Sequence, residues 1–382
     1  MYSQEDIESA VRSGVLDKYS AERLRTHVAR MRQIVSADEE ATRLVHSFND
    51  VFVAIAIVIV LIALGFIGQA IGSEVADDVF LATYKLYGGT ETFYVAHTLY
   101  YTAMYLAVGG LLIAITSWSL SEIFTRRRRM ALPSVLLSTS FTLAAFAVTF
   151  GVGGLLAWQQ IDDSAFAFAG AANLLAAIAA WLHWKRFEVP ITIALITLGI
   201  TGTIIGFVAS TLSLLHLEHA TVVTPFLIAL SGVAVFLFAM VWDTSDRRRI
   251  TRRSDVAFWL HLLAAPMIAH PLFYYMGITS GQADIGLTQA LAVLGVYTVF
   301  GLIALAVDRR ALLVSALAYV LITLGKLFDN FGSVELNFAL IALVIGSALL
   351  TLSTFWTSLR RALLKKLPLI MQAQLPDPAP PR

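Results

Sequence analysis

The chain has 382 residues, of which 58% are hydrophobic and only 14% are charged, and its formal net charge at pH 7 is +1. Soluble globular domains carry about 45–50% apolar and about 25% charged residues, so this composition excludes an ordinary soluble protein. The lack of cysteine excludes disulfides, thiolate metal ligands and a cysteine nucleophile.

Residues 1–50 are polar and charged and predict a small cytoplasmic helical segment, with no cleavable signal peptide expected. Ser3 with Asp6 resembles a capping box, Gly14 is placed to end a first short helix, and a second helix is expected from about Asp17. The second helix would be amphipathic and basic, which favours contact with anionic lipid or with a cytoplasmic protein partner. A helical hairpin packed on itself is the alternative.

Apolar runs of about 20 residues, the length that a bilayer core of ~30 Å requires, follow this segment. They predict an all-α fold, a polytopic transmembrane helical bundle of about ten spans. The runs cover residues 51–71, 94–119, 131–158, 164–184, 190–214, 221–242, 255–276, 285–307, 311–327 and 334–358. The transmembrane domain is therefore expected at 51–358, before a tail at 359–382 that is basic and then proline-rich.

The basic residues mark one side of this topology. Every Lys and Arg except Lys85 and Lys326 lies in the N-terminal segment, in the tail or in every second loop, whereas the other loops carry acidic residues. Because basic residues in short loops stay on the cytoplasmic side, both termini are predicted to be cytoplasmic. The expected location is a bacterial inner (plasma) membrane.

Five short segments stand out along the chain. They are Gly14-Val15-Leu16-Asp17, Ala21-Glu22-Arg23-Leu24, Phe48-Asn49-Asp50-Val51-Phe52-Val53, Phe258-Trp259-Leu260-His261-Leu262-Leu263 and His270-Pro271-Leu272-Phe273. With a short helical segment ahead of many spans, the chain resembles a family of bacterial polytopic membrane proteins whose function is unknown. The resemblance covers nearly the whole chain and implies a bacterial inner membrane. It implies no activity and no residue roles.

The seventh predicted span is the main candidate for a functional site because it contains two prolines. Pro266 stands about 16 Å along the helix from Asp255, close to mid-bilayer, where a proline frees the carbonyl four residues earlier and kinks the helix. Transporters build binding sites from such broken helices. The span also carries His261 and His270, which lie on opposite faces of an ideal helix. A structural kink with histidines bonded to neighbouring carbonyls is the alternative.

Two further groups are weaker candidates. His97, Tyr101 and Tyr105 stand at every fourth position of the second span, a stripe that lines a polar cavity or belongs to an interfacial aromatic belt. Lys326 and Asp329, near the outer end of the ninth span, form a candidate ion pair, unless Lys326 extends to the interface alone.

Enzyme signatures are absent from the sequence, which contains no P-loop, no HExxH and no GxSxG in a suitable context. One outer loop holds His216, Glu218 and His219, too few ligands in an exposed turn to predict a metal site. We therefore expect no enzymatic activity, no cofactor, no metal and no nucleic-acid partner.

Two functions remain open. The first is a small-solute transporter or permease with its site near the seventh span, and its partners would be the lipid bilayer and a small-molecule solute. Against it, the predicted spans are poor in buried acids, although coupled carriers commonly keep an intramembrane carboxylate. The alternative is a non-enzymatic membrane scaffold, sensor or envelope-maintenance protein that acts through its N-terminal helices.

Overall fold

The computed structural model describes a helical chain that divides into two compact units, residues 1–42 with 377–382 and residues 43–376. The described residues are 11, 13–17, 19–23, 48–87, 91–157, 161–215, 220–247, 249, 251–278, 287–310, 312–313, 316–317, 319–323, 343, 346–347 and 350–376. Their regular elements are all helices, which confirms the predicted all-α class for this part of the chain.

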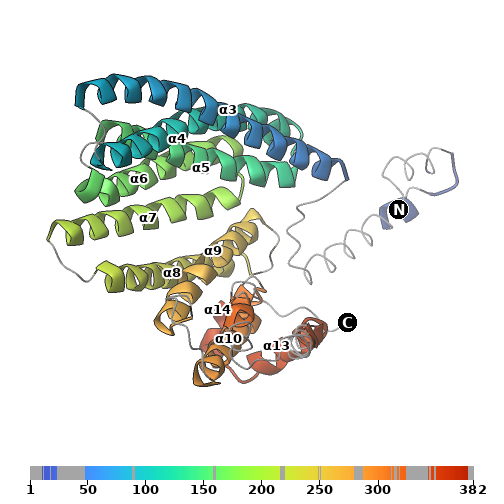
Figure 1. Ribbon diagram of the computed structural model, residues 1–382. Coiled ribbons are helices and arrows are strands. Elements are labelled where there is room, and N and C mark those ends of the chain that lie inside the picture. The colour runs from blue at the N-terminus through green and yellow to red at the C-terminus, as the bar shows by residue number, and fades with distance from the viewer. Residues whose placement is uncertain are drawn as a thin grey trace. The chain divides into compact units, whose positions relative to one another are not determined.

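The helices of the larger unit follow one another in a simple order (Figure 1). They are α3 (Phe48–Tyr87), α4 (Glu91–Ser121), the π-helix η1 (Glu122–Arg127), α5 (Ala131–Ala157), α6 (Ile161–Phe187), α7 (Ile191–Leu214), α8 (Ala220–Ser245), α9 (Arg252–Tyr275), α10 (Leu287–Val307), α13 (Trp356–Leu364) and α14 (Leu369–Gln374).

Seven helices in the described part of the chain are long and apolar enough to cross a membrane, and they correspond to α3 through α9. A shorter apolar helix, Leu291–Val307, lies where the eighth span is predicted. About half of the residues in the predicted spans at 311–327 and 334–358 lie outside the described residues. The total of about ten spans therefore stays a prediction.

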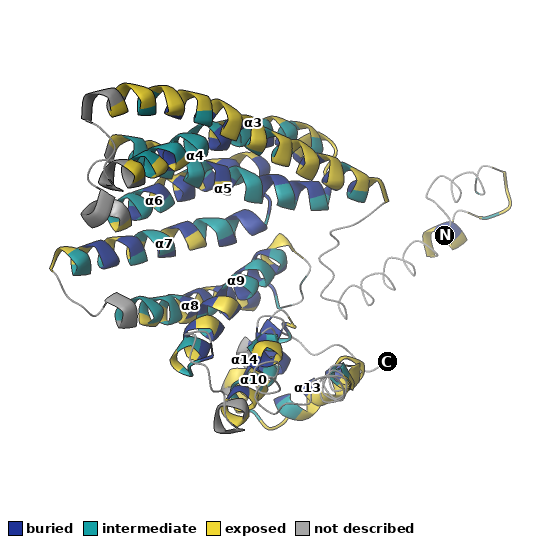
Figure 2. Cartoon of the chain, in the orientation of Figure 1, coloured by how far each residue is buried: buried dark blue, intermediate teal, exposed yellow. Residues whose placement is uncertain are grey.

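Large apolar side chains cover the outside of these helices, most clearly on α3, which is largely yellow in Figure 2. Phe52, Ile59, Ile62 and Phe66 of α3 are all exposed. A helix of a soluble protein turns a polar face to water, whereas a helix that is apolar all round lies in a core or in a membrane. The larger unit is thus compatible with an integral membrane protein.

The first helix is longer than its predicted span of 51–71. It runs from Phe48 to Tyr87, well beyond the predicted end at residue 71. Acidic residues such as Glu74 lower the hydropathy of this second half, but no proline interrupts it, so the backbone hydrogen bonds continue. Hydropathy therefore located this helix but not its end.

Glycines allow close approach between neighbouring helices at several positions, and at two of them the glycine meets another glycine. A Cβ atom on Gly68 of α3 would lie 2.2 Å from the Cα of Gly109 in α4. A Cβ on Gly206 of α7 would lie 2.7 Å from the Cα of Gly170 in α6. Small residues at such crossings let two backbones meet, which stabilises helix pairs in membranes through van der Waals packing.

Among the described residues, four that are not glycine adopt a positive φ, and each follows the end of a helix. They are Arg129 (53°), Glu188 (52°), Arg249 (53°) and Asp308 (60°). They recur at intervals of about 60 residues, as expected if helical hairpins repeat along the chain. A residue in this conformation is a common way to end a helix, although glycine is its usual occupant.

The basic turns at these helix ends contact one another. Arg186, at the end of α6, donates to Glu122 of η1 over 2.7 Å. Arg252, at the start of α9, donates to Glu188 before α7 over 2.9 Å. These ion pairs bring the arginine-bearing ends of α4, α6 and α9 to the same end of the larger unit.

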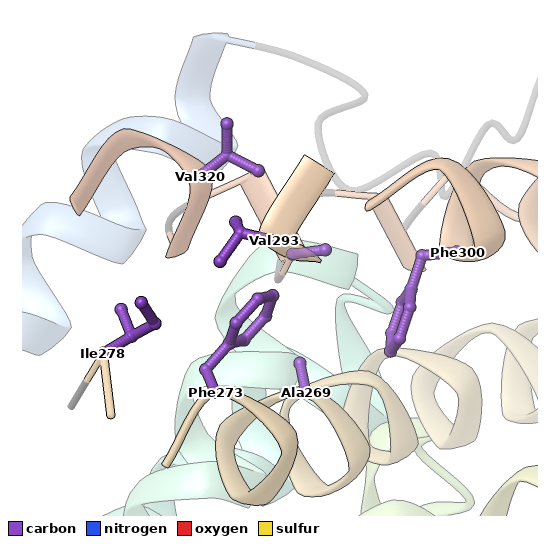
Figure 3. Close-up of a cluster of buried hydrophobic side chains, with 7 residues drawn as sticks. Ala269, Phe273, Ile278, Val293, Phe300 and Val320 are labelled. Carbon is purple, nitrogen blue, oxygen red and sulfur yellow. The ribbon is translucent and has the colours of Figure 1, made fainter. Parts of the chain in front are cut away.

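An apolar cluster joins the far part of α9 to α10 (Figure 3). Phe273 is fully buried at its centre, with Ala269 from the same helix and Val293 and Phe300 from α10. Val320 and Ile278 complete the packing. Burial of this many apolar groups fixes α9 against α10 and so positions the polar residues at their other ends.

Candidate functional site

Three buried ionisable side chains meet where α8, α9 and the turn after α10 come together. Asp243 belongs to the last turn of α8, His261 to α9, and Arg309 follows the end of α10. Their exposed fractions are 1%, 0% and 2%. Asp and Arg are almost never fully buried unless they are paired, so the way these groups satisfy one another decides what the site can do.

Arg309 binds the Asp243 carboxylate with two nitrogens. Its Nη2 lies 2.5 Å from Oδ1 of Asp243, and its Nε lies 3.3 Å from Oδ2. Nη2 also donates to the carbonyl oxygen of Ser254 at 3.1 Å and lies 3.3 Å from its hydroxyl. A two-pronged guanidinium–carboxylate pair is the strongest geometry for such a contact, so Asp243 is held as a charged carboxylate.

The imidazole of His261 reaches the same carboxylate, with its Nε2 at 2.9 Å from Oδ2 of Asp243. Because an ionised carboxylate only accepts hydrogen bonds, Nε2 carries the hydrogen in this contact. The ring of Phe236 packs edge-on against the imidazole, with 5.1 Å between ring centroids. The other nitrogen, Nδ1, is buried and has no partner among the described residues. In the neutral imidazole it is a free acceptor.

The turn between α8 and α9 sets the register that makes this contact possible. Oδ2 of Asp246 accepts hydrogen bonds from the backbone N–H and the hydroxyl of Thr251, at 2.8 and 2.7 Å. Thr251 in turn caps α9 by accepting from the N–H of Arg253. Capped in this way, α9 begins at a fixed point, and His261 returns to the level of Asp243.

A second set of contacts holds Arg309 in place. Arg249 donates to the Asp308 carboxylate at 3.0 Å and to the carbonyl oxygens of Val307 and Asp308. The indole N–H of Trp356 in α13 donates to the other Asp308 oxygen at 2.7 Å. Arg249 and Asp308 are both residues with a positive φ. The ion pair between Arg249 and Asp308 therefore links the turn after α8 to the turn after α10, directly beside Arg309.

The C-terminal helices are tied to the same end of α8. Arg247 donates to the carbonyl oxygen of Leu375 at 3.0 Å, and the buried Arg360 of α13 donates to that of Pro376 at 2.7 Å. Both acceptors follow α14. These contacts hold the segment after α14 against the turn that follows α8 and against α13.

The helix that carries His261 is the most enclosed of the candidate spans. In the most apolar 18-residue stretch of α9, 56% of the residues are buried. The corresponding share in the other six candidate spans is 17% to 39%. Pro266 is exposed and Pro271 is buried. Pro266 has no N–H to offer the carbonyl of Leu262, the residue next to His261. Pro266 thus lies about one and a half helical turns beyond His261, and Pro271 lies about three turns beyond it.

The other sequence candidates occupy different surroundings. His270 is exposed, and its Nδ1 lies 2.9 Å from the hydroxyl of Tyr319. His97 packs against Phe80 of α3, with 4.3 Å between ring centroids. Tyr105 lines a largely apolar pocket of about 460 Å³ between α3, α4 and α5, and Tyr101 is half-buried on α4. The lining residues of that pocket come from these three helices and not from α9.

Some predicted groups lie outside the described residues. These are Lys326, Asp329, His216, Glu218 and His219, so the candidate ion pair of Lys326 and Asp329 stays a prediction. Within the part of the chain that the structure describes, no three His, Asp or Glu side chains are grouped as ligands for a metal ion.

Sequence reasoning singled out His261 but missed its two partners. The sixth span was predicted to end at residue 242, and Arg309 was assigned to a cytoplasmic loop. The predicted spans are poor in buried acids, and the structure adds one that the prediction did not include, because Asp243 belongs to α8 and is buried. The available signal was an acid that directly follows an apolar run. This signal singles out Asp243 as a residue to consider, but it does not show which side chains Asp243 contacts.

Comparisons with known protein families, with curated proteins and with solved structures return no match for this chain. The resemblance to bacterial polytopic membrane proteins therefore rests on the quoted sequence segments alone.

Proposed function

We propose that the protein is an integral membrane permease for a small polar solute, without enzymatic activity, and that Asp243, His261 and Arg309 supply the polar groups of its transport site. One observation carries the proposal: ionisable side chains from α8, α9 and the turn after α10 meet in full burial at the arginine-bearing end of a bundle of apolar helices. Burial costs several kcal/mol per ion even in a pair. Ionisable residues inside membrane helices therefore commonly mark substrate or ion pathways.

The position of α9 supports the same assignment. It is the most enclosed candidate span, and Pro266 has no N–H for the carbonyl of Leu262, the residue that follows His261. A freed carbonyl and a buried imidazole are groups from which transporters build solute sites. Asp243 also supplies a buried carboxylate. The scarcity of such groups in the predicted spans was the argument against a coupled carrier.

The chemistry of the cluster suggests the class of solute. Asp243 recognises a cationic group and Arg309 an anionic one, and Nδ1 of His261 accepts a hydrogen bond. A zwitterion, such as an amino acid, offers both charges, so zwitterions are the first solutes to test. Simple amines, carboxylates and neutral polyols provide the comparison set.

We further propose that the arginine-bearing end of the larger unit faces the cytoplasm of a bacterial inner membrane, with residues 51–358 as the transport domain between cytoplasmic flanks at 1–50 and 359–382. The ion pairs that gather the basic turns at one end support this orientation. Because the chain has no cysteine, single cysteines can report it. R253C should react only with a label supplied from inside, and L156C only from outside. The reverse pattern refutes the orientation.

The permease proposal is tested with purified protein in proteoliposomes. Uptake of each solute class is measured for the wild type, for Asp243→Asn and for Glu188→Gln as a matched control. Glu188 also pairs with an arginine, at 2.9 Å, but its side chain is 67% exposed. We expect uptake of at least one class to fall more than about tenfold in Asp243→Asn, equivalent to about 1.4 kcal/mol, and to persist in Glu188→Gln. Equal uptake in all three proteins, or none above empty liposomes for any class, refutes the proposal.

The scaffold alternative depends on residues 1–50, most of which lie outside the described residues. It stays a prediction, as does a cytoplasmic protein partner for that segment.

A further inference from the structure

A second buried polar cluster lies between α4, α5 and α6. Ser117 and Ser121 of α4, Ser138 of α5 and His183 of α6 are each 0% exposed. Aromatic rings enclose the imidazole, with centroid distances of 5.8 Å to Trp118, 5.2 Å to Phe141 and 4.5 Å to Phe187. The proposed permease site does not use any of these groups.

The register between α5 and α6 places Ser138 beside His183. The hydroxyl of Thr149 in α5 lies 3.3 Å from the carbonyl oxygen of Ala172 in α6. In an antiparallel pair, about three helical turns back along α5 and three forward along α6 lead to Ser138 and His183. The ring contact between Phe141 and His183 agrees with this register.

The serines of α4 face the same imidazole. The hydroxyl of Ser121 lies 3.4 Å from Nε2 of His183, and it donates to the carbonyl oxygen of Ser117 at 2.8 Å. Ser117 precedes Ser121 by four residues and therefore lies on the same face of α4. α4, α5 and α6 thus each contribute polar side chains to the same buried region around His183.

Three of these polar atoms have no hydrogen-bond partner in the described part of the chain: Oγ of Ser117, Oγ of Ser138 and Nδ1 of His183. Buried polar atoms in native proteins nearly always bond to protein or to ordered water. Ser134 shows the ordinary solution one turn away, since its hydroxyl donates to the carbonyl oxygen of Met130. A whole group of unsatisfied atoms in one place indicates a missing ligand.

We propose that this cluster is a binding site for internal water, which bridges the hydroxyls of Ser117 and Ser138 and the Nδ1 of His183. Water both donates and accepts, so it satisfies hydroxyls and either tautomer of a neutral imidazole. Internal waters commonly make about three such bonds. The site links α4, α5 and α6 through solvent, and it does not depend on the proposed permease activity.

The first test needs no variant. Hydroxyl radicals generated by pulsed X-rays oxidise side chains next to bound water, and mass spectrometry of the full-length protein locates the products. Phe273 serves as the dry reference, because it is equally buried but lies in the apolar cluster of Figure 3. We expect His183 to be oxidised several-fold faster than Phe273. Equal, background-level oxidation of both residues overturns the proposal.

The second test uses the sign of a stability change. In Ser117→Ala/Ser138→Ala, loss of the bridging hydroxyls should lower both the oxidation of His183 and the midpoint of thermal unfolding. In Ser134→Ala, the matched control, oxidation of His183 should remain at the wild-type level. If the site is dry, the double variant only removes unsatisfied hydroxyls, and its midpoint rises with no change in oxidation. That result overturns the proposal.

Discussion

Asp243 and His261 stand on consecutive helices and meet through a contact of 2.9 Å between the carboxylate Oδ2 and the imidazole Nε2, with neither side chain exposed. Arg309 donates to both oxygens of the same carboxylate. The Asp243 carboxylate therefore links α8 both to α9 and to the turn after α10. The cost of leaving any partner alone in this low-dielectric place makes the cluster a sensitive site for substitution.

Removal of the guanidinium should destabilise the fold strongly. In Arg309→Met, the Asp243 carboxylate stays buried without its main partner, so we expect a loss of about 3–5 kcal/mol. In the control Arg252→Met, an exposed pair is lost, and the change should be below about 1 kcal/mol. Denaturant unfolding in detergent micelles measures both. Equal losses in the two variants would contradict the account.

The proline beside the cluster should matter more for transport than for stability. Pro266→Ala restores an N–H for the carbonyl of Leu262, which should raise helix stability by up to about 3 kcal/mol while solute uptake falls. Pro225→Ala provides the control, because Pro225 also lies inside a helix, α8, but outside the cluster. Thermal midpoints and uptake rates are compared for both. Undiminished uptake in Pro266→Ala would show that Pro266 has no part in transport.

Close packing of α3 on α4 should depend on one glycine and not on its neighbour. In Gly68→Ala, the new methyl group would overlap the backbone of Gly109, and we expect a loss of about 1–3 kcal/mol. In Gly65→Ala, nothing lies within 4 Å of the new methyl group, so stability should hold or rise by about 0.5–1 kcal/mol. Unfolding midpoints distinguish them, and a harmless Gly68→Ala would refute this close approach.

Asp17 caps the helical residues that begin at Tyr19, and the stability of this cap should fall in acid. Its Oδ1 accepts hydrogen bonds from the N–H groups of Tyr19 and Ser20, at 2.8 and 3.0 Å. Hydrogen bonds from the side chain and backbone of Ser20 hold the pKa of Asp17 below its ordinary value of 3.8. A lowered pKa in the folded state means that the stabilisation is complete above pH 3.8 and is lost as the pH falls through the folded-state value.

Amide hydrogen exchange at Tyr19 and Ser20 measures this effect. Protection factors should stay constant near neutral pH and drop in acid, and in Asp17→Asn the acid-dependent drop should disappear. A drop of the same size in both proteins would assign the acid response to other groups.

The helical class and the location of the apolar helices could be predicted because both depend on local composition. Helix ends were harder, since α3 continues to Tyr87 through residues of lower hydropathy. Asp243 shows the same limit at a functional position: hydropathy ended the span at residue 242, but backbone hydrogen bonding carries α8 to Ser245.

The partners within the site could not be predicted from one sequence. His261 was recognisable because an ionisable residue inside an apolar run is rare. Its contact with Asp243 depends on the rotation of two helices, and the contact with Arg309 depends on a turn at Asp308 with a positive φ. An arginine beside an apolar run fits a solvated loop equally well, so its burial was visible only in three dimensions.

Solute uptake by Asp243→Leu/Arg309→Met tests the central claim most directly. Replacement of a buried ion pair by apolar side chains of similar size is often neutral or stabilising, so this double variant separates folding from transport. Because the N–H of His261 also loses its acceptor, we predict an unfolding midpoint below that of the wild type but above that of Arg309→Met, which keeps the unpaired buried charge, together with loss of uptake. A stable double variant that takes up solute at the wild-type rate would show that the cluster serves only to hold the helices together, and would contradict the proposed permease site.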